Sequence, residues 1–295
     1  MKTCLFTVSF AGFWGQHKLS LEEAIAKTAA LGFQGIEIMG KRPHLSPLDY
    51  SLADCDRLRA MLDKHQLKLA AVAAYTNFTG GLAAAEVPFV DLQVAYVEAM
   101  AERAARLGGS LVRVFTGYER TDMPFAKQWQ IVVDALQACC DRAARHGITV
   151  GLQNHHDIGV HTQSLDALLA AVDRPNLIPM YDCWSPYLRG EDVVEGVQRM
   201  APRMQFTTVA DYRVLPRARY HPALVNYSAI EPAFAMAVPM GEGDLPYRQF
   251  FTALAKANFK GWVSYEMCSP IQGGGLLANL ERYAKTFLEY MRHFQ

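Results

Sequence analysis

The sequence lacks the features that mark several large classes of protein. No apolar run reaches the ~18 residues that a membrane-spanning helix needs, and the apolar stretch after Met1 is short and has no small-residue cleavage site. Lys plus Arg and Asp plus Glu both number 29, so the formal net charge is zero and gives no general attraction for nucleic acid or an anionic membrane. We therefore expect a cytoplasmic protein without a nucleic-acid or membrane partner.

Paired cysteines and the common phosphate-binding loops are also missing. The cysteines have no CxxC spacing, and the adjacent Cys139 and Cys140 would point to different parts of a helix. This pattern indicates free thiols in a reducing compartment rather than a zinc site or a disulfide framework. No expected strand is followed by GxGxxG or GxxxxGKS/T, which argues against a nucleotide-binding, doubly wound sheet.

Short β-rich segments alternate with longer amphipathic segments along almost the whole chain, and the 51% of apolar residues suffice for a large core. Ser20, Ser51 and Ser164 are typical helix N-caps. The expected strands are 4–10, 35–39, 68–74, 110–115, 148–153, 177–182, 204–209 and 261–267, and helical patterns include 20–32, 51–66, 89–109, 127–147, 164–172 and 190–201. Eight such units predict an α/β fold, a single (β/α)8 TIM barrel over residues 1–295.

One segment, at about 210–246, breaks this rhythm. Residues 210–244 of it contain four prolines, several aromatic residues and little helical periodicity. A loop of this length inside a compact domain is usually functional or disordered, and its apolar content argues against disorder. Arg217, Arg219 and His221 within it are either a solvated charge run or part of a lid that brings positive charge to an anionic or polyhydroxylated substrate.

Polar residues stand at the carboxyl ends of several expected strands, where TIM barrels place their active sites. Gln153, Asp182 and Glu266 end their strands, and strand alternation allows all three to point into the barrel mouth. Carboxylates together with oxygen or nitrogen ligands suit a hard divalent cation such as Mn²⁺ or Mg²⁺. Such a cation can polarise a sugar carbonyl while a carboxylate takes the neighbouring proton.

At these strand ends the chain resembles the xylose isomerase-like (β/α)8 barrels, often described as the sugar phosphate isomerase/epimerase family. The resemblance covers most of the chain and is carried by "LGFQGIEIM", "LQNHH", "YDCWSPYLRGED", "TTVADY", "VPMGEGD" and "GWVSYEM". Members typically bind one divalent metal through Glu, Asp, His and Glu from strands five to eight. Carried over by position, the resemblance implies Gln153, Asp182, Thr208 and Glu266 as the metal set.

Two of these positions depart from the family pattern. Gln153 stands where the family has its first glutamate, and Thr208 stands at the ligand histidine, while Asp211 is kept. An amide oxygen can ligate a metal but cannot serve as a base, so a symmetrical two-base proton transfer loses one partner. Glu266 is then the expected catalytic base.

His155 is the expected second catalytic residue. On an extended backbone His155 and His156 point to opposite sides, so one of them faces the site, and His155 occupies the family's usual histidine position. The residues expected to bind substrate are Glu37, Asn154, His156, Trp184, Asp211, Arg217, Arg219 and His221. Glu37 has an alternative role as the partner of a basic residue in the barrel.

Three functions are compatible with this site. The first is a metal-dependent sugar isomerase or epimerase acting by proton abstraction next to a carbonyl. The second is a lyase or hydrolase of an oxidised (3-keto) glycoside, because elimination needs only one base. The third is a catalytically degenerate barrel that binds a sugar or a partner protein. A small-molecule sugar is the expected partner, and a homo-oligomer is compatible with the sequence.

Overall fold

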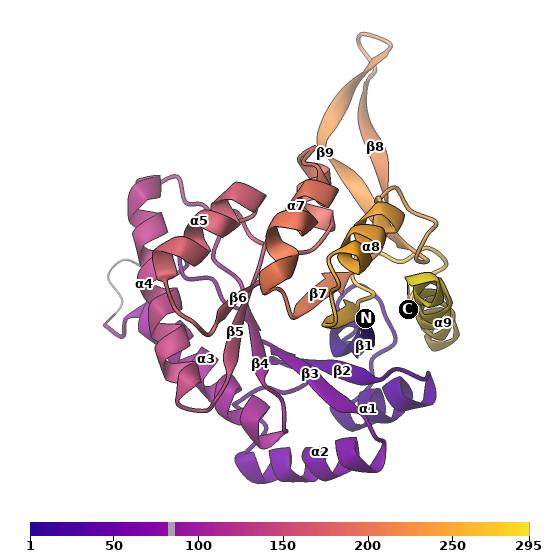
Figure 1. Cartoon of the computed structure of the whole chain (residues 1–295). Coiled ribbons are helices and arrows are strands. Elements are labelled where there is room, and N and C mark those ends of the chain that lie inside the picture. Colours follow the sequence, from indigo (N-terminus) through magenta and orange to yellow (C-terminus); the bar gives the residue numbers. More distant parts are fainter. Residues whose placement is uncertain (82–85, 295) are drawn as a thin grey trace.

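Eight parallel strands form the centre of the computed structural model, which describes residues 1–81 and 86–294. Their order is β6-β5-β4-β3-β2-β1-β10-β7, so β6 and β7 stand at the two ends of a nearly closed barrel (Figure 1). The strands are β1 (Lys2–Phe6), β2 (Gly35–Met39), β3 (Lys68–Ala73), β4 (Leu111–Val114), β5 (Thr149–Gln153), β6 (Leu177–Met180), β7 (Phe206–Val209) and β10 (Trp262–Tyr265). All eight overlap segments in which the sequence predicts strands, but the strand expected over 4–10 ends at Phe6, and Thr7–Phe10 form a 3-10 helix instead.

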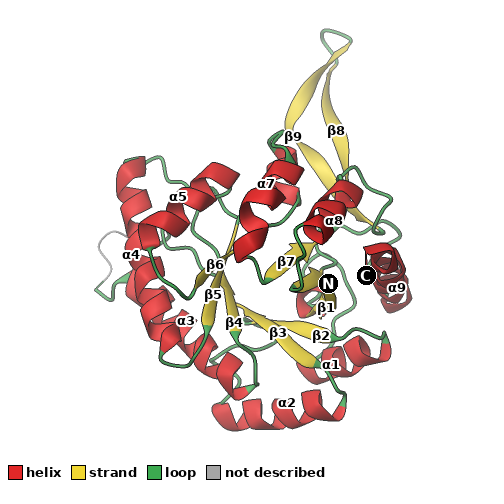
Figure 2. Cartoon of the chain, in the orientation of Figure 1, coloured by secondary structure: helices red, strands yellow, loops and turns green. Residues whose placement is uncertain are grey.

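Helices alternate with these strands and surround the barrel (Figure 2). They are α1 (Leu21–Ala30), α2 (Leu52–Lys64), α3 (Phe89–Arg106), α4 (Phe125–Ala144), α5 (Thr162–Val172), α6 (Trp184–Leu188), α7 (Val193–Met200), α8 (Tyr247–Lys256) and α9 (Leu277–Met291). Each longer helix buries one apolar face against the strands, as the amphipathic patterns predict. The predicted (β/α)8 barrel is therefore confirmed.

Side-chain caps fix where two of the helices begin. The side chains of Ser20 and Ser51 each accept a hydrogen bond from the N3 backbone amide, and the N3 carboxylate accepts one from the backbone amide of the cap residue. The cap expected at Ser164 is wrong, because α5 begins at Thr162. The Thr162 amide donates instead to Glu191, 3.0 Å away on another segment, a partner that local sequence patterns do not show.

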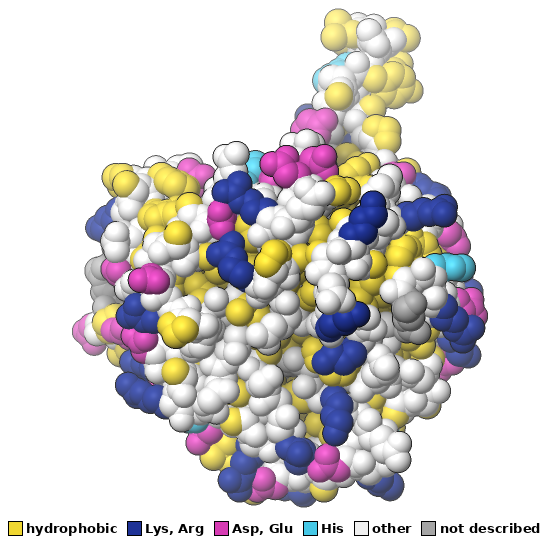
Figure 3. All heavy atoms as spheres, in the orientation of Figure 1, with side chains coloured by type: hydrophobic (Ala, Val, Ile, Leu, Met, Phe, Trp, Pro, Cys, Tyr) yellow, Lys and Arg dark blue, Asp and Glu magenta, His cyan; other side chains and the backbone are white. Residues whose placement is uncertain are grey.

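The segment expected to be a long loop contains a β-hairpin. β8 (Asp211–His221) and β9 (Asn226–Val238) pair antiparallel and project from the barrel beyond α7 and α8 (Figure 1). Leu224, Val225 and Tyr227 are exposed near its tip, and apolar side chains are visible along the arm in Figure 3. Among the helices of the described residues, none combines the length and apolar character of a membrane span.

Candidate active site

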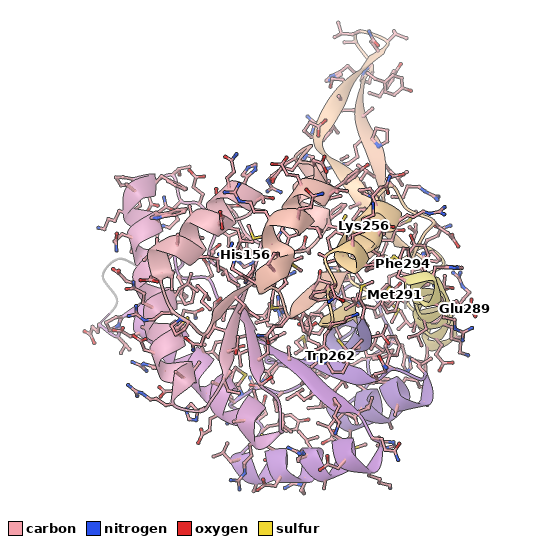
Figure 4. The ribbon with its side chains drawn as sticks, viewed as in Figure 1. His156, Lys256, Trp262, Glu289, Met291 and Phe294 are labelled. Atoms are coloured by element: carbon pink, nitrogen blue, oxygen red, sulfur yellow. The ribbon has the colours of Figure 1, made fainter. Side chains whose placement is uncertain are left out.

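A cavity of about 410 Å³ opens at the carboxyl ends of the barrel strands. It combines acidic, basic and aromatic groups, and its lining residues are Phe6, Val8, Phe13, Trp14, Lys41, Tyr75, Arg113, Phe115, Tyr118, Gln153, His155, His156, Glu266 and Cys268. A larger cavity of about 880 Å³ lies outside the barrel, where Lys256 and Phe294 line it. The labels of His156, Lys256 and Phe294 in Figure 4 mark these two separate regions. Of these two cavities, the first has a carboxylate, that of Glu266, beside basic groups and lies where TIM barrels place their active sites, so it is the candidate active site.

Glu266 follows β10 and reaches the cavity, as strand alternation predicts. Its surroundings raise the pKa of its carboxyl group to about 7, chiefly through burial and then through the negative charge of Glu37. A carboxyl group with a pKa near neutrality can both accept and return a proton at physiological pH. Glu266 therefore has the position and the acidity of a general base.

Glu37, in the middle of β2, is completely buried beneath this cavity. Its Oε2 accepts a hydrogen bond of 2.6 Å from the Ser264 hydroxyl, and its Oε1 lies 3.9 Å from Nε of Arg113. Burial raises the pKa of Glu37 to about 7 even though Arg113 lowers it. Glu37 thus takes the alternative role foreseen for it, as the partner of a basic residue inside the barrel.

Arg113, on β4, supplies the buried positive charge of the site. Its guanidinium stacks on the Phe115 ring at 4.0 Å, and Nη1 donates to Oε1 of Gln153 over 3.1 Å. Nε and Nη2 are buried without a hydrogen-bond partner among the residues that the structure describes. Arg113 also lowers the pKa of Glu37, Asp182 and Glu266, which shows that its charge acts on all three carboxyl groups.

The side-chain amide of Gln153 has only one orientation that satisfies its neighbours. Arg113 can only donate, so it must face the amide oxygen, and an ionised Asp182 can only accept, so it must face the amide nitrogen. The observed contacts agree, with Nε2 of Gln153 2.9 Å from Oδ2 of Asp182. Gln153 therefore links the guanidinium to the carboxylate and turns its N–H group, not its oxygen, toward Asp182.

The four residues expected to bind metal do not form a donor set that fits a divalent cation. The Gln153 oxygen already binds Arg113, and the Asp182 oxygens accept from Nε2 of Gln153 and from the Ser185 amide at 3.1 Å. Thr208 contributes only a neutral hydroxyl. Nor do residues 1–81 and 86–294 contain a cluster of three or more His, Cys, Asp and Glu side chains suited to a metal. A buried guanidinium in contact with this set further disfavours a cation there.

Both histidines of the strand-five motif line the cavity, so the expectation that only one faces it is wrong. His156 has a left-handed backbone (φ 67°), which breaks the extended alternation on which the expectation depended. Their ring centroids lie 5.0 Å apart, and both rings pack on Phe115. Nδ1 of His155 accepts a hydrogen bond from the His156 amide, so a neutral His155 ring carries its hydrogen on Nε2 and can donate a hydrogen bond from there.

Several lining residues escape the sequence prediction. Lys41 lies 3.8 Å from the Tyr75 ring and 4.9 Å from the Phe13 ring, and burial together with Arg113 lowers the pKa of its ammonium. Its position two residues beyond the end of β2 could have suggested it, since that is where TIM barrels place functional groups. Tyr118, which stacks on His156 at 4.1 Å, gave no comparable signal.

Three predicted substrate-binding residues have other partners in the structure and do not line the cavity. The Asn154 amide exchanges two hydrogen bonds with the Asp182 backbone and joins the ends of β5 and β6. The Asp211 carboxylate accepts backbone N–H groups of Gly241, Gly243 and Tyr212 and fixes the base of the hairpin. Trp184 packs against Tyr212, with ring centroids 4.3 Å apart.

The basic residues of the predicted lid lie on the projecting hairpin. Arg217 and Arg219 are exposed on β8, and His221, at its end, contacts Ser228 of the opposite strand at 2.7 Å. None of the three lines the cavity in the described residues. Within one chain, the structure therefore does not bring these cations to the candidate site.

Comparisons with known proteins place relatives of this chain among sugar-transforming enzymes. Residues 25–293 match the family model described as xylose isomerase-like TIM barrel. Fructoselysine 3-epimerase of Escherichia coli O157:H7 is 21% identical over 297 aligned positions, covering 99% of this chain and 98% of the relative. Inosose dehydratase of Geobacillus thermodenitrificans is 22% identical over 284 positions, covering 93% and 90%. D-allulose 3-epimerase from Methylomonas sp. has a TM-score of 0.74 at 18% identity, covering 100% of this chain and 98% of that one.

Proposed function

Because the chain belongs to the family of xylose isomerase-like TIM barrels, we propose that it is a sugar epimerase or isomerase that removes a proton from the carbon next to a carbonyl group. The observation that carries this proposal is the shared cavity of Glu266 and Arg113. A base and a buried cation that face one space can act on a C–H bond and on the adjacent carbonyl oxygen. The relatives named above, two epimerases and a dehydratase, support a sugar-transforming reaction of this kind.

Each polar group of the cavity has a role in this reaction. The Glu266 carboxylate accepts the proton, and the guanidinium of Arg113 holds the oxygen on which negative charge develops. His155, whose pKa burial lowers to about 4, is neutral and can donate a hydrogen bond from Nε2 to an oxygen of the sugar. The rings of Phe13, Trp14 and Tyr75 offer apolar faces for the carbon skeleton.

A second candidate, elimination from an oxidised sugar, is favoured by Gln153. An amide cannot act as a base, so the site has a single carboxylate base in Glu266. After proton removal, loss of a hydroxyl or glycosyl oxygen from the next carbon needs only an acid, and the Glu266 carboxyl group, which now holds the removed proton, can supply it. The two candidates share the first step and differ in where the second proton goes.

Proton exchange in deuterated water tests the shared step. The protein is incubated with D-fructose, D-allulose and inosose, and ¹H NMR follows the loss of signal from each carbon-bound proton. We expect exchange next to the carbonyl for at least one ketose, with a new epimer indicating the first candidate and a dehydrated product the second. Glu266→Gln should abolish exchange, and Glu289→Gln on the exposed face of α9 is the matched control (Figure 4). Exchange that persists in Glu266→Gln would refute the assignment.

A further inference from the structure

Some buried polar groups on and near the barrel floor have no hydrogen-bond partner. Within the residues that the structure describes, Nε and Nη2 of Arg113 and the Thr208 hydroxyl make no hydrogen bond, and Nε faces Oε1 of Glu37 at 3.9 Å, which leaves Nη2 as the guanidinium nitrogen without a counterpart. Leaving such groups unpaired is unfavourable, and native proteins keep them chiefly where a ligand completes them. Guanidinium N–H groups and a hydroxyl are donors, so the missing partner is an oxygen atom that carries partial or full negative charge.

We propose that the guanidinium of Arg113 takes the place that a divalent metal ion has in related barrels, so that the reaction proceeds without a metal. The inference rests on the proposed function for its chemistry, but its structural basis is separate. It assigns Arg113 as a catalytic residue that binds the substrate carbonyl oxygen through Nη2, since Nε faces Glu37 and Nη1 is held by Gln153. Gln153 is a positioning residue, since it holds Nη1 and connects it to Asp182.

The residues at positions 153 and 208, which depart from the family pattern, fit a site whose cation is Arg113. A glutamate at 153 would face the Asp182 carboxylate directly, and two carboxylates so close need a proton or a cation between them. Gln153 satisfies Asp182 with its own N–H group and accepts from Arg113 with its oxygen. Thr208, in place of an imidazole, offers only a buried hydroxyl, which makes no hydrogen bond within the described residues.

The chemical step balances without a further reactant. The Glu266 carboxylate takes the proton from the carbon next to the carbonyl, and the electron pair of the broken C–H bond forms the C=C bond of an enediolate. The electrons of the carbonyl π bond move onto its oxygen, whose negative charge the Arg113 N–H groups stabilise. A water molecule can return a proton to the opposite face, with the Glu266 proton neutralising the hydroxide left behind, and this gives the epimer. Transfer of the Glu266 proton to a neighbouring hydroxyl instead expels it as water and gives the dehydrated product.

Manganese binding tests the inference without any sugar. Protein stripped with chelator is mixed with MnCl₂, and the electron paramagnetic resonance signal of free Mn²⁺ is measured for the wild type, for Gln153→Glu and for Gln153→Glu/Thr208→His. We expect no binding by the wild type and binding by the variants, strongest in the double variant, with circular dichroism confirming that each is folded. Stoichiometric Mn²⁺ on the wild type that is lost in Glu266→Gln would overturn the inference. Absence of binding in all three proteins would equally overturn the role given to position 153.

Activity measurements separate this inference from the proposed function. For a sugar that exchanges its proton, we expect the wild-type exchange rate to be unchanged in excess EDTA. In Arg113→Lys we expect kcat to fall by about 10²- to 10³-fold, with a smaller change in KM. Exchange that needs added metal would refute metal-free catalysis and leave the sugar chemistry standing. If no sugar in the panel exchanges, the proposed function fails, while the manganese result still decides whether Arg113 has replaced the cation.

Discussion

Glu37 offers a direct measure of how strongly the barrel interior perturbs a carboxyl group. Its side chain is fully buried, and one of its oxygens has no hydrogen-bond partner in the part of the chain that the structure describes. Burial raises its pKa from 4.5 to about 7, more than Arg113 and Ser264 together lower it. The perturbation we choose is Glu37→Gln, which keeps the shape of the side chain and removes its titration.

The sign of the effect follows from proton binding. Between pH 4.5 and about 7 the unfolded chain has released the Glu37 proton while the folded protein still holds it. The free energy of unfolding therefore falls as pH rises through this window. Each pKa unit corresponds to about 1.4 kcal/mol, so the full contribution is about 3 kcal/mol. Glu37→Gln removes this contribution, and its stability relative to the wild type should rise by that amount across the same window.

The free energy of unfolding is measured by urea denaturation, followed by circular dichroism, at pH 4.5, 5.5, 6.5 and 7.5. These pH values span the window set by the pKa of Glu37. Glu266 and Asp182 titrate in both proteins, so most of their effect cancels in the difference. Glu289→Gln, on the exposed face of α9, is the control and should run parallel to the wild type. If the Glu37→Gln and wild-type curves are also parallel throughout, the raised pKa of Glu37 is wrong.

Three further predictions concern catalysis, the hairpin base and helix capping. For any sugar that exchanges its proton, kcat/KM should rise with pH to a plateau above about 7. The reason is that only the ionised Glu266 carboxylate accepts a proton, and burial raises the pKa of this group to about 7. A midpoint near the ordinary value of 4.5 would contradict this. Asp211→Ala leaves the amides of two loop glycines unpaired and should lower the free energy of unfolding by about 2–3 kcal/mol, measured in urea. Ser20→Ala should cost about 1 kcal/mol by the same assay, whereas Ser164→Ala, inside α5, should cost clearly less.

The barrel could be predicted from sequence because its signals are local and repeated. Alternation in β5 and β10 correctly places Gln153 and Glu266 toward the barrel mouth, since a residue's face in a strand follows from its number alone. The same rule failed one step later, at His156, where a left-handed backbone brings a second imidazole to the cavity. Short turns of this kind depend on tertiary packing, here on Phe115 and Tyr118, which no local pattern records.

The roles of polar residues were harder to predict than their positions. Asp211 sits in a motif that the family resemblance associates with the site, yet its carboxylate is used by loop amides 30 and 32 residues away. Asn154 is likewise used by the backbone of the next strand. Hydrogen bonds between a side chain and the backbone of a residue far away along the chain cannot be predicted from one sequence. Here they show that residues expected to bind substrate instead hold the backbone in place.

The charge balance at the barrel mouth shows why one substitution could change what the site requires. Arg113 is the cation whose charge lowers the pKa of Glu37, Asp182 and Glu266 alike. A glutamate at 153 would add a fourth carboxylate opposite Asp182, where amide and carboxylate are now 2.9 Å apart, and one guanidinium would no longer offset the set. With the Gln153 amide at this position, a hydrogen bond to Asp182 replaces that repulsion, and the charge of Arg113 suffices to offset the remaining carboxyl groups. We therefore expect the need for a metal to follow the residue at position 153 rather than the fold.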